Sequence, residues 1–130
     1  MTKFNKKFDV LEKHTTIILI VIIILQLLVI ALFGVLKGAY FVDEIHTFGL
    51  SNSYYKPFIT WNEEPNSWHD TEFYLNFLTV QADERFAYDS VYYNQVNDVH
   101  PPLYYFGFHT LCSFFPNIFS KWLGIIFNMF

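Results

Sequence analysis

The longest apolar stretch of the chain runs from Thr15 to Leu36 and contains no charged residue and one amide, Gln26. An α-helix needs about 20 apolar residues to cross a hydrocarbon layer of about 30 Å, because it rises about 1.5 Å per residue. A cleaved secretory signal would have a shorter apolar region and a site of small residues after it, and Lys37-Gly38-Ala39 is only a weak site of that kind. The pattern therefore predicts a retained transmembrane helix over residues 15–36.

The segment 37–102 mixes polar residues with many aromatic ones, which indicates a folded loop rather than a disordered linker. Within it, the stretch Glu72–Asp83 places apolar residues near helical spacing, at Phe73, Phe77, Leu78 and Val80. That spacing predicts an amphipathic helix lying on the membrane surface. Trp61 and Trp68 suit the lipid headgroup zone, where an apolar ring with an N–H donor is favoured.

The apolar pattern returns at Leu103, breaks at Pro116-Asn117 and resumes from Ile118 to Phe130. The pair Pro101-Pro102 cannot continue a helix from upstream but can begin one, because the first helical turn leaves its N–H groups unpaired anyway. We expect a second membrane helix and the start of a third over residues 103–130. The predicted fold class is thus an all-α integral membrane protein, and the apolar final residues lead us to expect the front portion of a longer polytopic chain.

Composition agrees with a membrane protein, since 53% of the residues are hydrophobic, 22% are aromatic and only 15% are charged. The net charge is −4, and no basic cluster lies outside the first residues, so nothing would displace the counterions of a nucleic acid. The single cysteine, Cys112, permits no internal disulfide.

Charge is distributed unevenly along the chain. The first 14 residues hold four lysines, whereas the segment 37–102 holds ten of the twelve acids against two lysines and Arg85. Lysine-rich flanks of a transmembrane helix stay in the cytoplasm. We therefore predict a cell-membrane protein with a cytoplasmic N-terminus over residues 1–14 and an extracytoplasmic loop over residues 37–102.

Two adjacent carboxylates, Asp43 and Glu44, follow the first helix by a few residues. Near the low-dielectric boundary of a membrane, desolvation and mutual repulsion can raise the pKa of one of them, which suits a general base. The plainer interpretation is that the two acids mark the water boundary and cap a following helix at Asp43.

A second polar group stands at the mouth of the next helix, in the sequence Asp98-Val99-His100-Pro101-Pro102-Leu103-Tyr104-Tyr105. A histidine before two prolines can simply fill a turn, and tyrosine pairs such as Tyr104-Tyr105 most often pack at interfaces, although they can also stack on a sugar ring. Asp98, His46, His69 and Asp70 could in principle join His100 as metal ligands, but no spacing typical of a zinc site supports this, so we assign no metal ligands.

The order of these features resembles the GT-C superfamily of membrane glycosyltransferases, in particular the bacterial relatives of dolichyl-phosphate-mannose protein mannosyltransferases and of aminoarabinose lipid A transferases. The resemblance runs from Thr15 to Phe130, and its most specific part is the motif His-Pro-Pro-Leu-Tyr-Tyr at 100–105, about 55 residues after the Asp-Glu pair. It implies a polytopic enzyme that moves a sugar from a polyprenyl-phosphate carrier to an extracytoplasmic glycan, lipid or protein acceptor.

The resemblance also implies roles for individual residues. Asp43 matches the catalytic acid of the first outer loop and would act as the general base, with Glu44 orienting the acceptor or sharing the proton. Asp98, His100, Tyr104 and Tyr105 match the second motif and would bind the substrate, with His100 donating to a phosphate oxygen.

The chain departs from such enzymes in having one long apolar span and one arginine in its outer loop. We therefore expect the 130 residues alone to be inactive. No cofactor is implied, and a need for a divalent metal stays open. The alternative from another class is a small membrane-anchored structural or interaction protein without catalysis, and a third interpretation is a metal-binding ectodomain on a single span.

Overall fold

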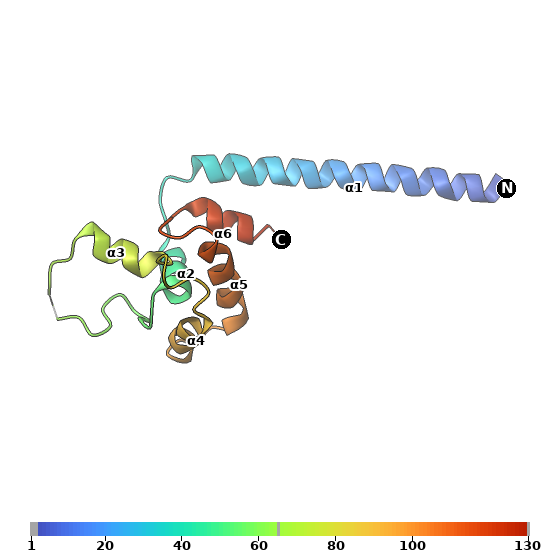
Figure 1. Cartoon of the computed structure of the whole chain (residues 1–130). Helices are drawn as coiled ribbons and strands as arrows, with labels where there is room; N and C mark the ends of the chain where they lie inside the picture. Colours follow the sequence, from blue (N-terminus) through green and yellow to red (C-terminus); the bar gives the residue numbers. More distant parts are fainter. Residues whose placement is uncertain (1–2, 65, 130) are drawn as a thin grey trace. The chain divides into compact units, whose positions relative to one another are not determined.

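The computed structural model describes residues 3–64 and 66–129, and among these residues the regular structure is entirely helical (Figure 1). The chain divides into two units, Met1–Gly38 and Ala39–Phe130. The first unit contains α1, and the second contains the remaining helices: α2 (Val42–Asn52), α3 (Thr71–Leu78), α4 (Tyr88–Val96), α5 (Pro102–Ser113) and α6 (Lys121–Phe127). The all-helical prediction is confirmed for the described residues.

The described part of the first unit contains one continuous helix, α1 (Lys3–Leu36). Its stretch Glu12–Leu36 is 25 residues long and contains an 18-residue window with a mean hydropathy of 3.3, and it is the one stretch of the described residues long and apolar enough to cross a membrane. At about 1.5 Å per residue it measures roughly 37 Å, more than the hydrocarbon thickness. The helix expected over residues 15–36 is thus present, while the crossing itself and its direction stay predictions. The expected cytoplasmic segment 1–14 begins with two residues outside the described ones.

The second unit is organised around α2 and α5. Helix α2 contacts α3, α4 and α5, and α5 also contacts α4 and α6. Phe48 of α2 and Phe108 of α5 meet edge to face at 4.9 Å between ring centroids, which is a favourable aromatic geometry. The core around them consists of Phe77, Leu78, Val80, Cys112 and Leu123. A glycine is needed at position 49, because a Cβ there would lie 2.2 Å from the ring of Phe77.

The end of α2 is held by buried polar side chains from other helices. The last carbonyl groups of a helix have no partner within it, so they need donors from elsewhere. The amide of Asn94, which is fully buried, donates to the carbonyl oxygens of Leu50 at 3.3 Å and Ser53 at 2.8 Å. The imidazole Nδ1 of His109 lies 2.7 Å from the carbonyl oxygen of Ser51. These bonds fix α2 against α4 and α5.

The helix expected over Glu72–Asp83 is shorter than the sequence pattern suggested. Helix α3 ends at Leu78, and the side chains of Phe77, Leu78 and Val80 are buried in the protein core. The expectation that these residues face lipid is wrong, because the same apolar spacing serves equally well to pack a helix against protein.

The segment 103–130 forms two short helices in the second unit rather than one long apolar helix. The expected start at the proline pair is confirmed, since α5 begins at Pro102, and the expected break lies between Ser113 and Lys121. Helix α5 has 12 residues, about 18 Å, and α6 has 7. Further membrane crossings in this segment stay a prediction, and Phe130 lies outside the described residues.

Candidate functional site

A cavity of about 240 Å³ lies in the second unit and brings together residues that are far apart in the sequence. Helix α2 contributes four of its side chains, the turn before α5 contributes two, and α5 and the loop after α2 contribute one each. The lining residues are Asp43, His46, Thr47, Leu50, Phe58, Asp98, His100 and Tyr105. Four of the six residues proposed from the sequence are among them: Asp43, Asp98, His100 and Tyr105.

The spacing on α2 explains why four of its residues share this cavity. Asp43, His46, Thr47 and Leu50 follow one another at intervals of three, one and three residues, so they lie on one face of the helix. Asp43 and His46 are exposed, whereas Leu50 is buried and packs with Val91 and Tyr105. The cavity therefore has polar residues at its mouth and an apolar base.

Asp98 and His100 form a hydrogen-bonded pair on the turn between α4 and α5. The Nδ1 atom of His100 lies 2.7 Å from Oδ2 of Asp98, and the backbone N–H of His100 donates to the same oxygen at 3.4 Å. Pro101 then adopts extended backbone and α5 begins at Pro102, as the sequence predicts. The proline pair thus holds the Asp98–His100 pair outside the helix, beside the cavity.

The electrostatics of this pair define what His100 can offer to a ligand. Partial burial raises the pKa of the Asp98 carboxyl, but the hydrogen bonds from His100 and from the backbone of Val99 and His100 outweigh it and bring the pKa below its ordinary value. An ionised carboxylate only accepts hydrogen bonds, so Nδ1 of His100 carries the hydrogen that points to Asp98. Its Nε2 atom then accepts from a ligand when the ring is neutral and donates to a ligand when the ring is protonated.

Two residues proposed from the sequence lie outside the cavity lining. The carboxylate of Glu44 accepts a hydrogen bond from the backbone N–H of Phe41 at 2.9 Å, so it caps the start of α2. Capping was the plainer interpretation of the acidic pair, although the cap is provided by Glu44 rather than Asp43. Tyr104 packs against Phe127 at 5.1 Å between centroids, and its hydroxyl group lies 3.2 Å from the side-chain nitrogen of Asn128.

His46 and Thr47 line the cavity although the sequence predicts no function for Thr47 and only a notional metal ligand at His46. Their helical spacing of three and four residues from Asp43 indicates that they share its face of α2. Of the other notional ligands, Asp98 and His100 also line the cavity, whereas His69 stacks on Phe73 and Asp70 caps α3. Within the described residues, no group of three His, Cys, Asp or Glu side chains is arranged to hold a metal ion.

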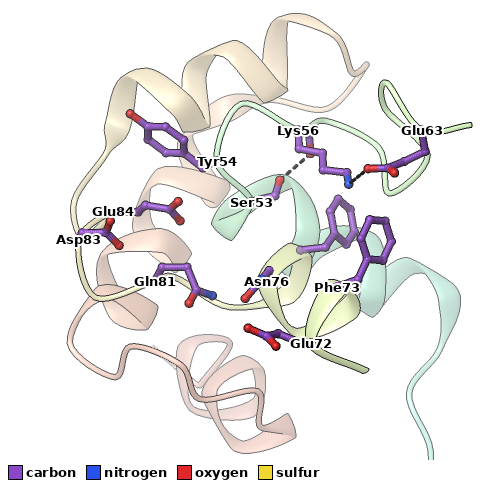
Figure 2. A pocket seen from close by; sticks show the side chains of 11 residues that line it. Ser53, Tyr54, Lys56, Glu63, Glu72, Phe73, Asn76, Gln81, Asp83 and Glu84 are labelled. Carbon is purple, nitrogen blue, oxygen red and sulfur yellow. Dashed lines mark hydrogen bonds and ion pairs between the residues drawn. The ribbon is translucent and has the colours of Figure 1, made fainter. Parts of the chain in front are cut away.

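A second and larger hollow, of about 590 Å³, lies between the loop after α2, helix α3 and the loop after α3 (Figure 2). We call it the acidic groove, because its lining includes four carboxylates and one lysine. The lining residues are Ser53, Tyr54, Lys56, Glu63, Glu72, Phe73, Asn76, Phe77, Gln81, Asp83 and Glu84. None of the residues proposed from the sequence is among them.

Lys56 contacts two other side chains of the acidic groove. The Nζ atom of Lys56 lies 2.6 Å from Glu63 and 4.0 Å from the centre of the Phe73 ring, and Figure 2 shows it directed toward Glu63. The hydrogen bond from Lys56 lowers the pKa of Glu63. Burial, and then the neighbouring Asp83, raise the pKa of Glu84. The groove therefore offers excess negative charge and no cation that is not already paired with Glu63.

Comparison with known proteins adds no assignment: no family model, no curated protein and no solved structure matches this chain. The functional argument therefore rests on the residues of the cavity and on their order in the sequence.

Proposed function

We propose that this chain forms the first part of a polytopic, GT-C-type membrane glycosyltransferase that moves a sugar from a polyprenyl-phosphate carrier to an extracytoplasmic acceptor. In this proposal the N-terminus is cytoplasmic, α1 crosses the cell membrane, and the cavity on the outer side is the catalytic site. The acceptor is a hydroxyl group of a glycan, a lipid or a protein.

The observation that carries the proposal is the meeting of two sequence motifs in one cavity. Asp43 follows the apolar span by seven residues, and Asp98 and His100 come about 55 residues later, yet all three line the same hollow. The resemblance to GT-C enzymes rests on this pair of motifs. A carboxylate, a carboxylate–imidazole pair and an apolar base in one cavity also suit a substrate that combines a phosphate, a sugar and a hydrocarbon tail.

The chemistry assigns one role to each polar group. The carboxylate of Asp43 takes the proton of the acceptor hydroxyl as that oxygen forms a bond to the anomeric carbon of the sugar. The bond from this carbon to the phosphate oxygen breaks, and its electron pair leaves with the lipid phosphate. Protonated His100, held by Asp98, donates from Nε2 to a phosphate oxygen and so stabilises the charge of the leaving group.

Substitution of Asp43 tests the assignment. The test uses membranes that contain the proposed polytopic enzyme, of which this chain is the first part. In this enzyme, Asp43→Asn keeps the shape of the side chain but removes the proton acceptor. General-base catalysis contributes about 10²–10⁴ to a rate, so transfer of radiolabelled sugar from polyprenyl phosphate should fall at least about 100-fold. Asp83→Asn, in the acidic groove, is the matched control and should leave transfer unchanged. Near-normal transfer by a correctly inserted Asp43→Asn protein would overturn the proposal.

A further inference from the structure

His109, on α5, ties that helix to the end of α2. Its imidazole ring is 2% exposed, and Nδ1 lies 2.7 Å from the carbonyl oxygen of Ser51 on α2. A carbonyl oxygen only accepts hydrogen bonds, so Nδ1 carries the hydrogen of this bond. The other ring nitrogen, Nε2, is buried and has no hydrogen-bond partner among the described residues. The contact between α2 and α5 therefore fits a neutral imidazole, with one hydrogen on Nδ1 and none on Nε2.

Protonation of this ring would add a hydrogen and a positive charge at a buried atom that has no partner. A buried charge without a partner costs much free energy, whereas a histidine ring in water takes up a proton with a pKa of about 6.5. Burial accordingly lowers the pKa of His109, and the hydrogen bond to the Ser51 carbonyl, which raises it, offsets this only in part. Mild acid therefore favours any state of the protein in which this ring reaches water.

The ionisable side chains around α5 do not provide the missing partner. They are Asp43, Glu44 and His46 on α2, Tyr88, Asp89, Tyr92 and Tyr93 on α4, Lys121 on α6, Arg85 in the loop before α4, and Tyr104, Tyr105 and Cys112 on α5 itself. The ring of Tyr88 lies edge to face with the imidazole, at 5.7 Å between centroids, and its hydroxyl group lies 3.0 Å from that of Thr110. Glu44 and Asp89 accept hydrogen bonds from other residues. No carboxylate in the described part of the chain bonds to the imidazole, so a charged ring would be left uncompensated.

The same contact holds the two sides of the cavity together. Helix α2 brings Asp43, whereas the turn before α5 brings Asp98 and His100, and α5 itself brings Tyr105. We propose that His109 is an acid-sensitive clamp: the neutral ring holds α2 against α5, and uptake of a proton in mild acid releases α2 and opens the cavity. This regulation needs neither a membrane nor catalysis, so its test is independent of the proposed function.

Cys112, the single cysteine of the chain, reports the release of α2. Its side chain is 1% exposed, and its thiol is hydrogen-bonded to the side chain of Asn52 at the end of α2. A thiol reagent therefore reaches it when α2 moves away. The full chain is held in detergent micelles and treated with dithiodipyridine, which reacts with thiols in acid as well as at neutral pH. The protection of Cys112 is the reaction rate of protein unfolded in guanidinium divided by the rate of folded protein at the same pH.

The lowered pKa of His109 determines the direction of the effect. The clamp is fully in place above the unfolded-state pKa of about 6.5 and is lost as the pH falls toward the folded-state value. Protection of Cys112 should therefore fall about tenfold between about pH 7.5 and about pH 5.5. The amide of His109→Asn can donate to the Ser51 carbonyl but takes up no proton in this range, so this variant should keep its protection. His100→Asn, at an exposed histidine, should behave like the unchanged chain.

Two results would overturn the clamp. One is protection of the unchanged chain that does not vary with pH, and the other is an equal fall in His109→Asn. If His109→Asn already lacks protection at neutral pH, carbon-13 NMR of the histidine rings in the unchanged chain decides instead. His109 should take up its proton over the same pH range in which Cys112 loses protection, and proton uptake while Cys112 stays protected would contradict the proposal.

Discussion

The small cavity and the acidic groove differ in size, charge and origin. The groove is the larger, with about 590 Å³ against about 240 Å³, and it is built mainly from the loop after α2 and from residues 72–84. The cavity joins the face of α2 to the turn that precedes α5. In the groove, Lys56 is paired with Glu63. In the cavity, the Asp98 carboxylate is paired with Nδ1 of the His100 imidazole.

Volume alone therefore does not identify a site of chemistry. A catalytic site needs groups that can accept or donate a proton toward a ligand. The cavity offers an exposed carboxylate and two imidazoles at its mouth, while the groove offers mostly like charges. The most useful experiments therefore change one hollow and use the other as the control.

The largest effect in this comparison, after loss of Asp43, is expected from His100. A hydrogen bond to a charged group contributes about 1.5–3 kcal/mol, which corresponds to about a 10- to 100-fold change in affinity. His100→Ala should therefore weaken use of the lipid-phosphate donor by this factor, measured as a rise in the apparent KM, with a smaller effect on the acceptor. His69→Ala, beside the groove, should leave both unchanged. An equal loss in both variants would contradict a special role for the cavity.

A smaller expected effect concerns the carboxyl groups of the two hollows, whose pKa values are shifted in opposite directions. The pKa of Asp98 lies below its ordinary value of 3.8, and that of Glu84 lies above its ordinary value of 4.5. Asp98 therefore stabilises the fold above its unfolded-state pKa, and this is lost as the pH falls through the folded-state value. Glu84 behaves in the opposite sense, and its contribution is lost as the pH rises through the folded-state pKa.

Carboxyl-carbon NMR titrations of single variants check these directions. His100→Ala should raise the pKa of Asp98, because its largest favourable hydrogen bond is removed, and Asp83→Asn should lower the pKa of Glu84 by removing a neighbouring charge. If His100→Ala left Asp98 titrating at the same pH, the hydrogen-bonded pair would not exist in solution.

The parts of the fold that the sequence predicts are those with strong local signals. The apolar span needs no tertiary partner to be recognised, and Pro101-Pro102 determines a helix start by backbone chemistry alone. Over residues 72–83 the expected helix is present up to Leu78, but Phe77, Leu78 and Val80 are covered by protein, because periodicity shows that an apolar face exists and not what covers it. The core contacts of Phe77 and Val80 depend on α2 and α5, which periodicity does not report.

The candidate site divides in the same way. Asp43, Asp98, His100 and Tyr105 were found through their place in two motifs, and His46 and Thr47 could have been found from helical spacing to Asp43. Glu44 is adjacent to Asp43 in sequence but lies on a different face of α2, where it caps the helix. The acidic groove is formed by residues from three separate segments, and no local sequence pattern predicts it.

The binding position of a prenyl phosphate shows directly whether the cavity is the donor site. The chain has five histidines, of which His46 and His100 line the cavity, His69 lies beside the groove, His14 is in α1 and His109 is buried. The protein is labelled with carbon-13 at the histidine rings and held in detergent micelles. Farnesyl phosphate should shift the resonances of His46 and His100 and leave that of His69 in place. Farnesol, which lacks the phosphate, should shift none of these three resonances. A shift confined to His69, or none at saturating farnesyl phosphate, would contradict the assignment of the cavity as the site for a lipid-linked phosphate.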